Sequence, residues 1–352
     1  MITDVDFWQM GAGHRVRIMT LINFLSKRTA FTLLFIGPGD IEAKVLSEIY
    51  GINFVYLNKD QILGFRQYGE LMKKFMRDKD FGFCIIEYVH NSYFLNFLSD
   101  NIITILDAHD IISERTKSFA KSEYEHLYYQ MTQKNEFDLF SFYDYVMVLC
   151  QSDLLEIKRL CPSINVLLVP HPPELNRHPV RENVKTVGFV ASQYKPNIEA
   201  IIKFISEAWT SFHNEGIDLS IYGNICFELK KYSFDPSVHL MGYLNQIRDI
   251  YDQLDIVVNP VFRGAGLKIK TIEALANGLP LITTSHGARG LNDGHNKYLI
   301  IADSSNDFIN SIFKLRDNLN FRTAISNSAF SYSSSNFSVD QCYKSLVTAL
   351  NA

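Results

Sequence analysis

Residues 255–284 read DIVVNPVFRGAGLKIKTIEALANGLPLITT, and this stretch decides the fold. A buried apolar run is followed by a glycine loop at 263–266 and then by a helical pattern over 267–277. Gly278 stands where a glycine commonly ends a helix, and Pro280 prevents the helix from continuing. The stretch therefore predicts a strand–loop–helix–strand unit, with the glycine loop at the carboxyl end of a strand, where open α/β sheets bind ligands.

The same alternation extends over the whole chain. Short, continuous apolar runs suit strands that are buried on both faces, and therefore parallel α/β layers. In the first half the runs predict strands at 31–36, 52–57, 82–86, 102–106, 145–149 and 166–169, and the helical patterns lie at 15–26, 67–77 and 112–137. In the second half we expect strands at 186–190, 218–222, 238–241 and 256–259, and helices at 197–212 and 247–254.

The length of 352 residues exceeds the size at which single cores stop growing, so two domains are expected. A cluster of four prolines between 170 and 179 marks the linker. We expect a first domain at 1–172, a linker at 173–185, a second domain at 186–335 and a last helix at 336–352, which could return to the first domain. The serine-rich patch at 331–335 is expected to be a hinge or loop. The predicted class is α/β, with two facing Rossmann-like domains on parallel sheets.

Composition limits the classes of function. The net charge of −4 gives no electrostatic basis for bulk nucleic-acid binding. Five scattered cysteines without a C-x-x-C pair predict neither a disulfide framework nor a zinc site. No apolar run approaches the ~18 residues of a membrane helix, and the first residues carry acids where a secretory signal carries basic residues. The sequence therefore predicts a cytoplasmic location.

Three cations, Arg263, Lys268 and Lys270, gather where the helix at 267–277 begins. Cations are unfavourable at the positive end of a helix, unless an anion such as a diphosphate bridges them. A solvated basic turn is the alternative. Glu273 adjoins the face of this helix that should be buried, and a carboxylate there needs a partner. Ribose hydroxyls would serve, and a local pair with Lys270 is the alternative.

At these residues the sequence resembles the retaining GT-B glycosyltransferases of family four (glycosyl transferases group 1). Members share the pattern E-A-x-A-x-G-x-P, which here runs from Glu273 to Pro280, and the loop G-A-G-L-K-I-K is similar to one subgroup. The resemblance implies that Glu273 holds the donor ribose. The first glutamate of the family's Glu–seven residues–Glu pattern would fall at Ala265 and is missing. The residues that would surround the donor diphosphate are Arg263, Gly264, Ala265, Gly266, Leu267 and Lys268.

Weaker matches lie elsewhere in the chain. Lys195 resembles a basic residue that reaches the diphosphate, with a surface lysine as the alternative. Gly223 follows a predicted strand and resembles a loop that lines the nucleotide-base pocket, although an ordinary turn would look the same. In the first domain the run GAGHRVR at 11–17 resembles the family's first glycine loop. Its best matches for donor binding are Gly13 and Arg17.

Two further residues end strands of the first domain. His109 follows the strand at 102–106 in the run Asp-Ala-His-Asp, and related enzymes have a similar run whose histidine contacts the donor sugar or the reaction centre. The resemblance therefore implies that His109 is catalytic, together with Glu273. Glu87 follows the strand at 82–86 and is expected to help bind the acceptor. Both residues have a purely structural alternative, because polar side chains at strand ends are common.

No metal and no cofactor other than the nucleotide-sugar donor are expected. The two D-x-D triplets, at 4–6 and 78–80, lack the strand-end context of a metal-dependent enzyme. The glycines at 11–13 half-fit a dinucleotide fingerprint, but Val16 occupies the third glycine position and Asp40 comes too late to hold a ribose. An NAD-dependent oxidoreductase is therefore a weaker alternative. A second alternative is a non-catalytic protein of the same fold that binds a nucleotide sugar or serves as a scaffold.

The resemblance implies a glycosyltransferase that moves a sugar from a nucleotide-diphosphate sugar to an acceptor hydroxyl with retention of configuration. The expected acceptor is a glycan, a lipid-linked molecule or a protein, in the synthesis of a cell-surface glycan such as lipopolysaccharide, capsule or a glycoprotein sugar. Peripheral association with the inner face of the plasma membrane is a second expectation for the location. Nucleic acid is not an expected partner.

Overall fold

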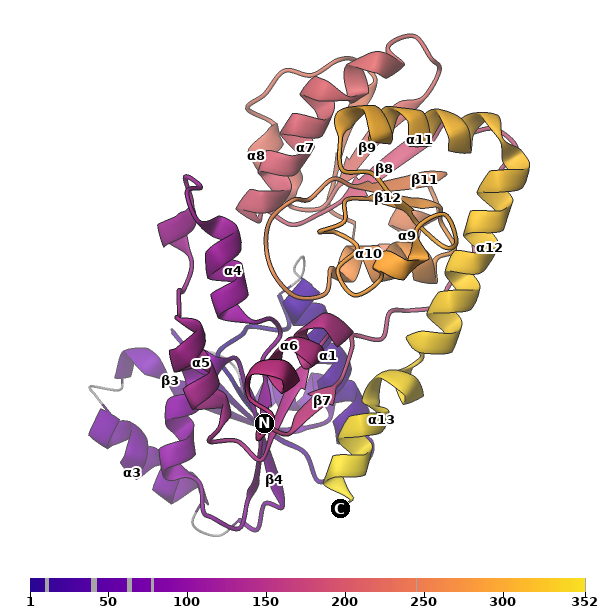
Figure 1. The fold of residues 1–352 in the computed structure, drawn as a ribbon. Coiled ribbons are helices and arrows are strands. Elements are labelled where there is room, and N and C mark those ends of the chain that lie inside the picture. The colour runs from indigo at the N-terminus through magenta and orange to yellow at the C-terminus, as the bar shows by residue number, and fades with distance from the viewer. Residues whose placement is uncertain (10–12, 39–42, 62–64, 77–78, 245, 352) are drawn as a thin grey trace.

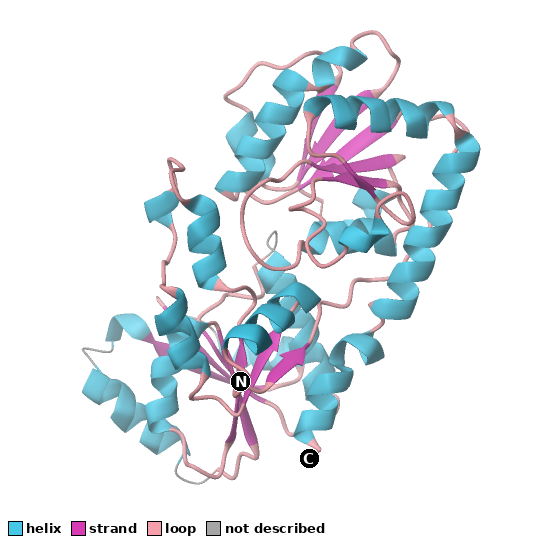
Figure 2. Cartoon of the chain, viewed as in Figure 1, coloured by secondary structure: helices cyan, strands magenta, loops and turns pink. Residues whose placement is uncertain are grey.

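The computed structural model describes residues 1–9, 13–38, 43–61, 65–76, 79–244 and 246–351 (Figure 1). Two separate groups of strands, each flanked by helices, form a lower and an upper lobe in Figure 2. All of the strand pairs in both sheets are parallel. This arrangement confirms the α/β class and the two facing Rossmann-like domains.

The first sheet has the order β3-β2-β1-β4-β5-β6-β7. Its strands are β1 (Ile2–Thr3), β2 (Thr32–Gly37), β3 (Asn53–Asn58), β4 (Phe83–Glu87), β5 (Ile103–Asp107), β6 (Tyr145–Val148) and β7 (Val166–Leu168). The six predicted strands are present, each within one residue of its expected bounds. The interior strand β1 was not predicted, because two apolar or β-branched residues followed by acids carry too short a pattern.

The second sheet has the order β10-β9-β8-β11-β12-β13. Its strands are β8 (Thr186–Val190), β9 (Asp218–Tyr222), β10 (Val238–Gly242), β11 (Ile256–Asn259), β12 (Leu281–Thr283) and β13 (Ile300–Ile301). The deciding stretch forms β11, then α10 (Ile269–Ala276), then β12, as predicted. The helix begins two residues later than expected, because Lys268 is its N-cap and has an extended backbone. The short strand β13 was not predicted.

The other helices cover both faces of the sheets. In the first domain they are α1 (Gly13–Ser26), α2 (Ala43–Tyr50), α3 (Phe65–Met76) and α6 (Gln151–Leu160), with short 3₁₀ turns η1 (Lys59–Gln61) and η2 (Val89–Phe97). In the second domain they are α7 (Lys195–Glu207), η4 (Trp209–Phe212), α8 (Ile225–Leu229), α9 (Ile247–Tyr251), η5 (Asn292–Gly294) and α11 (Ser305–Asp317).

The helical pattern at 112–137 is not one helix. It divides into α4 (Ile112–Phe119), η3 (Glu125–Leu127) and α5 (Gln133–Phe140). The chain leaves the helix at Lys121, whose φ of 63° is left-handed, and Thr132 then caps α5 by accepting the Asn135 N–H. In Figure 1, α4 rises from the first domain towards α7 and α8 of the second.

The serine-rich patch at 331–335 is not a hinge or loop, because it lies inside α12 (Leu319–Asn336). Its serines are accommodated in the helix: Ser333 is buried, and the Ser334 hydroxyl donates to the Phe330 carbonyl at 2.7 Å. The neighbouring Tyr332 stacks on Tyr298 of the second domain at 3.9 Å between ring centroids. Packing therefore outweighs the weak helix propensity of serine.

The last helix, α13 (Val339–Leu350), packs against the first domain. The Ser345 hydroxyl donates to the Leu168 carbonyl at 2.6 Å, and the Tyr343 ring lies 4.4 Å from that of Phe24. In Figure 1, α12 and α13 run down one side of the molecule from the second domain to the first. The chain therefore crosses between the domains twice, in the linker and at this helix pair.

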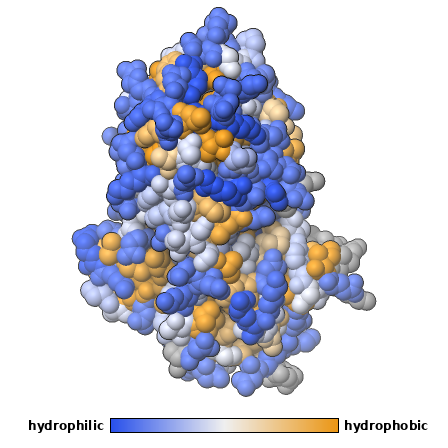
Figure 3. Space-filling model, turned by 90° about the vertical axis from the view of Figure 1, so that its right-hand side faces the viewer, coloured by the Kyte–Doolittle hydropathy of each residue, from blue (hydrophilic) through white to orange (hydrophobic). Residues whose placement is uncertain are grey.

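Among the helices that the structure describes, none has the length and apolar character needed to cross a membrane. The face in Figure 3 shows hydrophobic side chains in separate patches among hydrophilic ones. Val339 and Val347 of α13 are among the exposed apolar residues of the described chain.

Candidate active site

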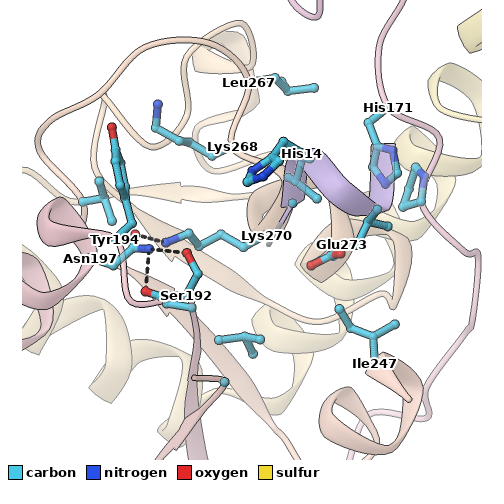
Figure 4. Close-up of a pocket in the computed structure, with 18 of the residues that line it drawn as sticks. His14, His171, Ser192, Tyr194, Asn197, Ile247, Leu267, Lys268, Lys270 and Glu273 are labelled. Atoms are coloured by element: carbon cyan, nitrogen blue, oxygen red, sulfur yellow. Dashed lines mark hydrogen bonds between the residues drawn. The ribbon is translucent and has the colours of Figure 1, made fainter. Parts of the chain in front are cut away.

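A cavity of about 1030 Å³ lies between the two domains (Figure 4). The first domain lines it with the start of α1, the turn after β5 and the segment around α4 and η3. The second domain lines it with the loop after β8, the glycine loop and α10. Loops at the carboxyl ends of parallel strands form its walls, which is where open α/β sheets bind ligands. Of the expected donor-binding residues, those that line it are Gly13, Gly223, Arg263, Gly264, Ala265, Leu267, Lys268 and Glu273.

The amino ends of two helices meet at this cavity. Helix α1 begins at Gly13, and a Cβ atom added there would lie 2.9 Å from Cδ1 of Ile269, the first residue of α10. A larger residue at this position would have to displace the end of the Ile269 side chain, so glycine favours the close approach of the two domains. The amino end of a helix carries partial positive charge and unpaired N–H groups. Both domains thus present features that favour an anion to the same space.

Two half-buried lysines lie at the start of α10. Lys268 Nζ donates to the carbonyls of Ala265 at 2.8 Å and Gly266 at 3.2 Å, and burial lowers its pKa to about 8. Lys270 Nζ donates to Asn197 Oδ1 at 2.5 Å, and burial lowers its pKa to about 7. Figure 4 shows both lysines at the cavity. Because burial disfavours the charged form of each lysine, an anionic ligand would offset that cost.

Glu273 lies one turn further along α10 and also lines the cavity. Its Oε2 atom accepts a hydrogen bond from the Tyr251 hydroxyl at 3.1 Å. Burial raises its pKa to about 7. The partner found in the structure is therefore Tyr251 of α9, a residue that the sequence analysis did not single out.

The glycine loop is held by the first domain. The Gly264 N–H donates to Ser118 Oγ at 2.8 Å, and Arg263 donates through Nη1 to the Ser118 carbonyl at 2.9 Å. Arg263 Nε also lies 3.5 Å from Glu199 Oε2, which accepts from the Tyr124 hydroxyl at 2.5 Å. These contacts join α4 and the segment that follows it to α7 and the glycine loop, so the two domains are in direct contact around the cavity.

Three of the residues expected to bind the donor do not line the cavity: Gly266, Arg17 and Lys195. Arg17 is fully buried, and its Nε and Nη2 atoms donate to the two carboxylate oxygens of Asp107, each at 2.9 Å. Its Nη1 atom donates to the Val169 carbonyl at 2.9 Å. The guanidinium is thus held inside the first domain, which corrects the donor-binding expectation for Arg17. The side chain of Lys195 is exposed and is not part of the cavity wall, so the structure shows no contact that supports its expected role.

His109 and Glu87 lie together behind the cavity wall. His109 Nε2 is 2.5 Å from Glu87 Oε2, and the His109 ring stacks on Tyr88 at 4.1 Å. Glu87 is fully buried, and this burial raises its pKa to about 7. Neither residue lines the cavity. Glu87 therefore contacts His109 instead of lying where an acceptor could bind, which corrects its expected role.

Glu87, Asp107 and His109 offer ligand atoms within 4.8 Å of one another, which is close enough to suggest a metal ion. Both carboxylate oxygens of Asp107, however, already accept hydrogen bonds from the Arg17 guanidinium. The Arg17 guanidinium supplies a positive charge to this cluster, and His109 contacts Glu87, so protein groups partner all three side chains.

The D-x-D triplets are placed only in part. Asp4 accepts from Asn91 at 3.0 Å and lies 2.9 Å from His90 Nε2, and Asp6 pairs with Arg15 at 2.7 Å. The carboxylates of the first triplet are therefore engaged by protein groups. In the second triplet Asp78 lies outside the described residues, as do Gly11 and Asp40 of the dinucleotide comparison.

The structure also brings in residues that the sequence analysis passed over. His14 and Asp110 line the cavity from the first domain, and Asn197 and Tyr194 line it from the second. Burial lowers the pKa of His14 to about 4, so its ring is neutral at pH 7. Both first-domain residues lie next to a residue that the sequence analysis selected, since His14 follows Gly13 and Asp110 follows His109. The sequence analysis did not consider them separately.

Comparison with sequence families and curated proteins gives two matches. Residues 184–318 match the family described as "Glycosyl transferases group 1". A Klebsiella pneumoniae protein described as "Uncharacterized 44.6 kDa protein in cps region" is 27% identical over 172 residues, which are 46% of this chain and 44% of that protein. The matched part is thus less than half of the Klebsiella protein.

Solved structures with the same fold are similar over nearly the whole chain. Sucrose-phosphate synthase from Thermosynechococcus elongatus has a TM-score of 0.74 at 12% identity. The similarity covers 99% of this chain and 97% of the synthase chain. Anabaena Alr3699/HepE in complex with UDP and glucose has a TM-score of 0.72 at 13% identity, with 98% of both chains covered. An S. aureus TarM mutant in complex with Fondaparinux, alpha-GlcNAc-glycerol and UDP has a TM-score of 0.64 at 16% identity, with 81% of this chain and 59% of TarM covered. The expected GT-B fold is confirmed.

Proposed function

We propose that this protein is a glycosyltransferase that moves a sugar from a nucleoside-diphosphate sugar to an acceptor hydroxyl. The observation that carries the proposal is the pair of half-buried lysines, Lys268 and Lys270, at the amino end of α10 in the cavity between the domains. A diphosphate over this helix end would offset both charges. The ribose would then lie at Glu273, one turn further along α10, and the base towards Gly223.

The comparisons support this proposal. The matched family segment, residues 184–318, contains the two lysines, Glu273 and Gly223. The Anabaena protein of the same fold is in complex with UDP and glucose. The Klebsiella protein in a cps region supports a role in cell-surface polysaccharide synthesis. The cytoplasmic location, with peripheral association at the membrane, is part of the proposal. Retention of configuration, and membership of the subgroup with the G-A-G-L-K-I-K loop, follow from the resemblance and are part of the proposal.

The chemical task is to stabilise the departing diphosphate. The lysines and the N–H groups at the start of α10 would face the negative charge as it develops, without having to reorganise. Contact of α4 with the second domain would exclude water that could otherwise hydrolyse the donor. The expected catalytic role of His109 remains part of the proposal, supported by a ring that Glu87 and Tyr88 hold in place.

The test is turnover of a panel of nucleotide sugars by the purified protein. We expect release of the nucleoside diphosphate from at least one of them, faster with the true acceptor present, and a product whose anomeric configuration, measured by NMR, equals that of the donor. A product with inverted anomeric configuration would contradict only the proposed retention, not the glycosyltransferase activity. No release from any donor, together with binding of NAD, would favour the oxidoreductase instead.

Affinity for a nucleotide sugar should fall as the pH rises above neutrality. Burial lowers the pKa values of Lys268 to about 8 and Lys270 to about 7, so the free protein loses these charges in that range. A bound diphosphate favours the charged forms, and binding must then take up protons. We expect Kd to increase at least ~10-fold between about pH 7 and pH 9.

The measurement is calorimetric titration across this pH range. Glu273 titrates near the same pH, since burial raises its pKa to about 7, so the Glu273→Gln variant is titrated in parallel. Lys270→Arg serves as the control, because arginine stays charged throughout and should flatten the slope. A Kd that does not change with pH in the wild type or in Glu273→Gln would contradict the assignment of the lysines.

Turnover should not depend on a divalent metal. The proposed charge stabilisation comes from lysines and helix N–H groups, and the carboxylates of Asp4 and Asp6 are engaged by His90, Asn91 and Arg15. We expect EDTA to leave the rate of donor consumption unchanged. Loss of activity that Mn²⁺ restores would show instead that a metal ion binds the donor.

A further inference from the structure

The turn after β5 presents Asp110 to the cavity. The Asp110 N–H donates to the Ala108 carbonyl at 2.7 Å, and His109 between them has a φ of 60°. A three-residue turn of this kind places a non-glycine residue in the left-handed region, which is strained, and such strain clusters at functional sites. The turn sends the two successive side chains to different places: His109 contacts Glu87, and Asp110 lines the cavity.

Arg115 holds the Asp110 carboxylate. Its Nη1 atom donates to both carboxylate oxygens, at 2.9 and 2.8 Å. The two side chains are 17% and 14% exposed, and both line the cavity. A single nitrogen shared by two oxygens leaves further lone pairs on the carboxylate for a ligand. Asp110 is therefore fixed in position but still able to accept hydrogen bonds.

Asp110 also lies opposite the proposed diphosphate site. A Cβ atom added to Gly266 would be 3.0 Å from the Asp110 Cβ and from the His109 carbonyl oxygen, so this turn of the first domain packs against the glycine loop of the second. Of the charged groups near Lys268, Asp110 shifts the lysine pKa most. Its negative charge raises this pKa, whereas burial lowers it. The carboxylate that the family pattern places at Ala265 is absent from this chain. Asp110 supplies one from the other side of the same loop.

We propose that Asp110 binds the sugar that is transferred, with Arg115 as its positioning residue. This inference rests on the proposed function. The carboxylate accepts hydrogen bonds from sugar hydroxyls and faces the positive charge that builds up at the anomeric carbon. The bond from that carbon to the diphosphate breaks with its electron pair leaving on phosphate, the acceptor oxygen bonds to the carbon, and the acceptor proton passes to the departing phosphate oxygen. The cavity thus places cations beside the leaving group and a carboxylate beside the sugar.

The test compares Asp110→Asn with Asp138→Asn, which makes the same change at an exposed position of α5. Wild-type protein is first titrated with UDP and GDP and assayed for donor consumption, and failure at this step would remove the proposed function itself. With an active wild type, Asp110→Asn should lower kcat at least ~10²-fold. Its Kd for the nucleoside diphosphate, measured near pH 6, where Lys268 with its pKa of about 8 is charged, should stay the same or decrease, because a negative charge beside Lys268 is lost. Asp138→Asn should match the wild type in both measurements.

Three results would overturn the inference. One is an Asp110→Asn variant as active as Asp138→Asn, and another is a variant that loses nucleotide binding in proportion to activity. The third is loss of folding in both Asp110→Asn and the smaller Asp110→Ser, which would assign the carboxylate to stability. For the positioning role, Arg115→Lys should retain more of kcat than Arg115→Gln, since a lysine nitrogen can also lie between the two oxygens. Equal loss in both variants would remove that role.

Discussion

Replacement of Lys268 by alanine should lower kcat/KM for the nucleoside-diphosphate sugar by ~10²-fold, equivalent to ~3 kcal/mol of transition-state stabilisation. Lys268 is the half-buried N-cap of α10 and lines the cavity. Loss of a preorganised charged donor to the leaving group has an effect of this size. The melting temperature of the free protein should not decrease much, because burial already disfavours the lysine charge and lowers its pKa to about 8.

Lys195→Ala is the matched control for this variant. The two lysines were both expected to reach the diphosphate, but the Lys195 side chain is exposed at the start of α7 and lies outside the cavity. Lys195→Ala should therefore keep near-normal kcat/KM. Normal activity of Lys268→Ala with a loss in Lys195→Ala would place the diphosphate at α7 and contradict the site described above.

Replacement of Arg17 by methionine should destabilise the protein by ~3–5 kcal/mol, the usual cost of removing one partner of a buried ion pair. Arg17 and Asp107 are both fully buried, and the guanidinium also donates to the Val169 carbonyl at 2.9 Å. The variant would leave an unpaired carboxylate at the end of β5. For a domain of this size the melting temperature should fall on the order of 10 °C.

The control is Arg15→Met, two residues earlier on α1. Arg15 pairs with Asp6, and its side chain and that of Asp6 are 25% and 42% exposed, so this variant should change stability by less than ~1 kcal/mol. Below its own melting temperature, Arg17→Met should bind the nucleoside diphosphate as the wild type does. A selective loss of binding at unchanged stability would return Arg17 to the donor site.

The sequence predicts those parts of the fold whose residues carry a complete local pattern. The stretch at 255–284 contains an apolar strand, a glycine loop, a helical period and a stop signal, and the structure forms each of these elements. Strand β1, in contrast, has only two residues and is defined by its pairing with β2 and β4. Residues 331–335 look like a loop by propensity and become helical through packing. Long-range pairing and packing cannot be obtained from local composition.

The residues of the candidate site also form two groups, those with a local sequence pattern and those placed by long-range contacts. Lys268 and Glu273 could be found because they lie on one helix with a recognisable pattern around it. Arg17 and Lys195 also follow recognisable patterns, but the partner of Arg17 is 90 residues away at Asp107, and no local signal reports that pairing. Asp110 acquires its proposed role only because the second domain brings Gly266 against it. Residues that face one another across the domains become visible only in three dimensions.

The most direct test of the central claim is a calorimetric titration of the wild-type protein and Lys268→Ala with nucleoside diphosphates at neutral pH. If the cavity between the domains is a donor site, one nucleoside diphosphate should bind with a stoichiometry of about one per chain, and Lys268→Ala should weaken that binding at least ~10-fold, as expected for a lost charge-assisted hydrogen bond. The absence of binding by UDP, GDP and ADP, or binding that Lys268→Ala leaves unchanged, would contradict the account.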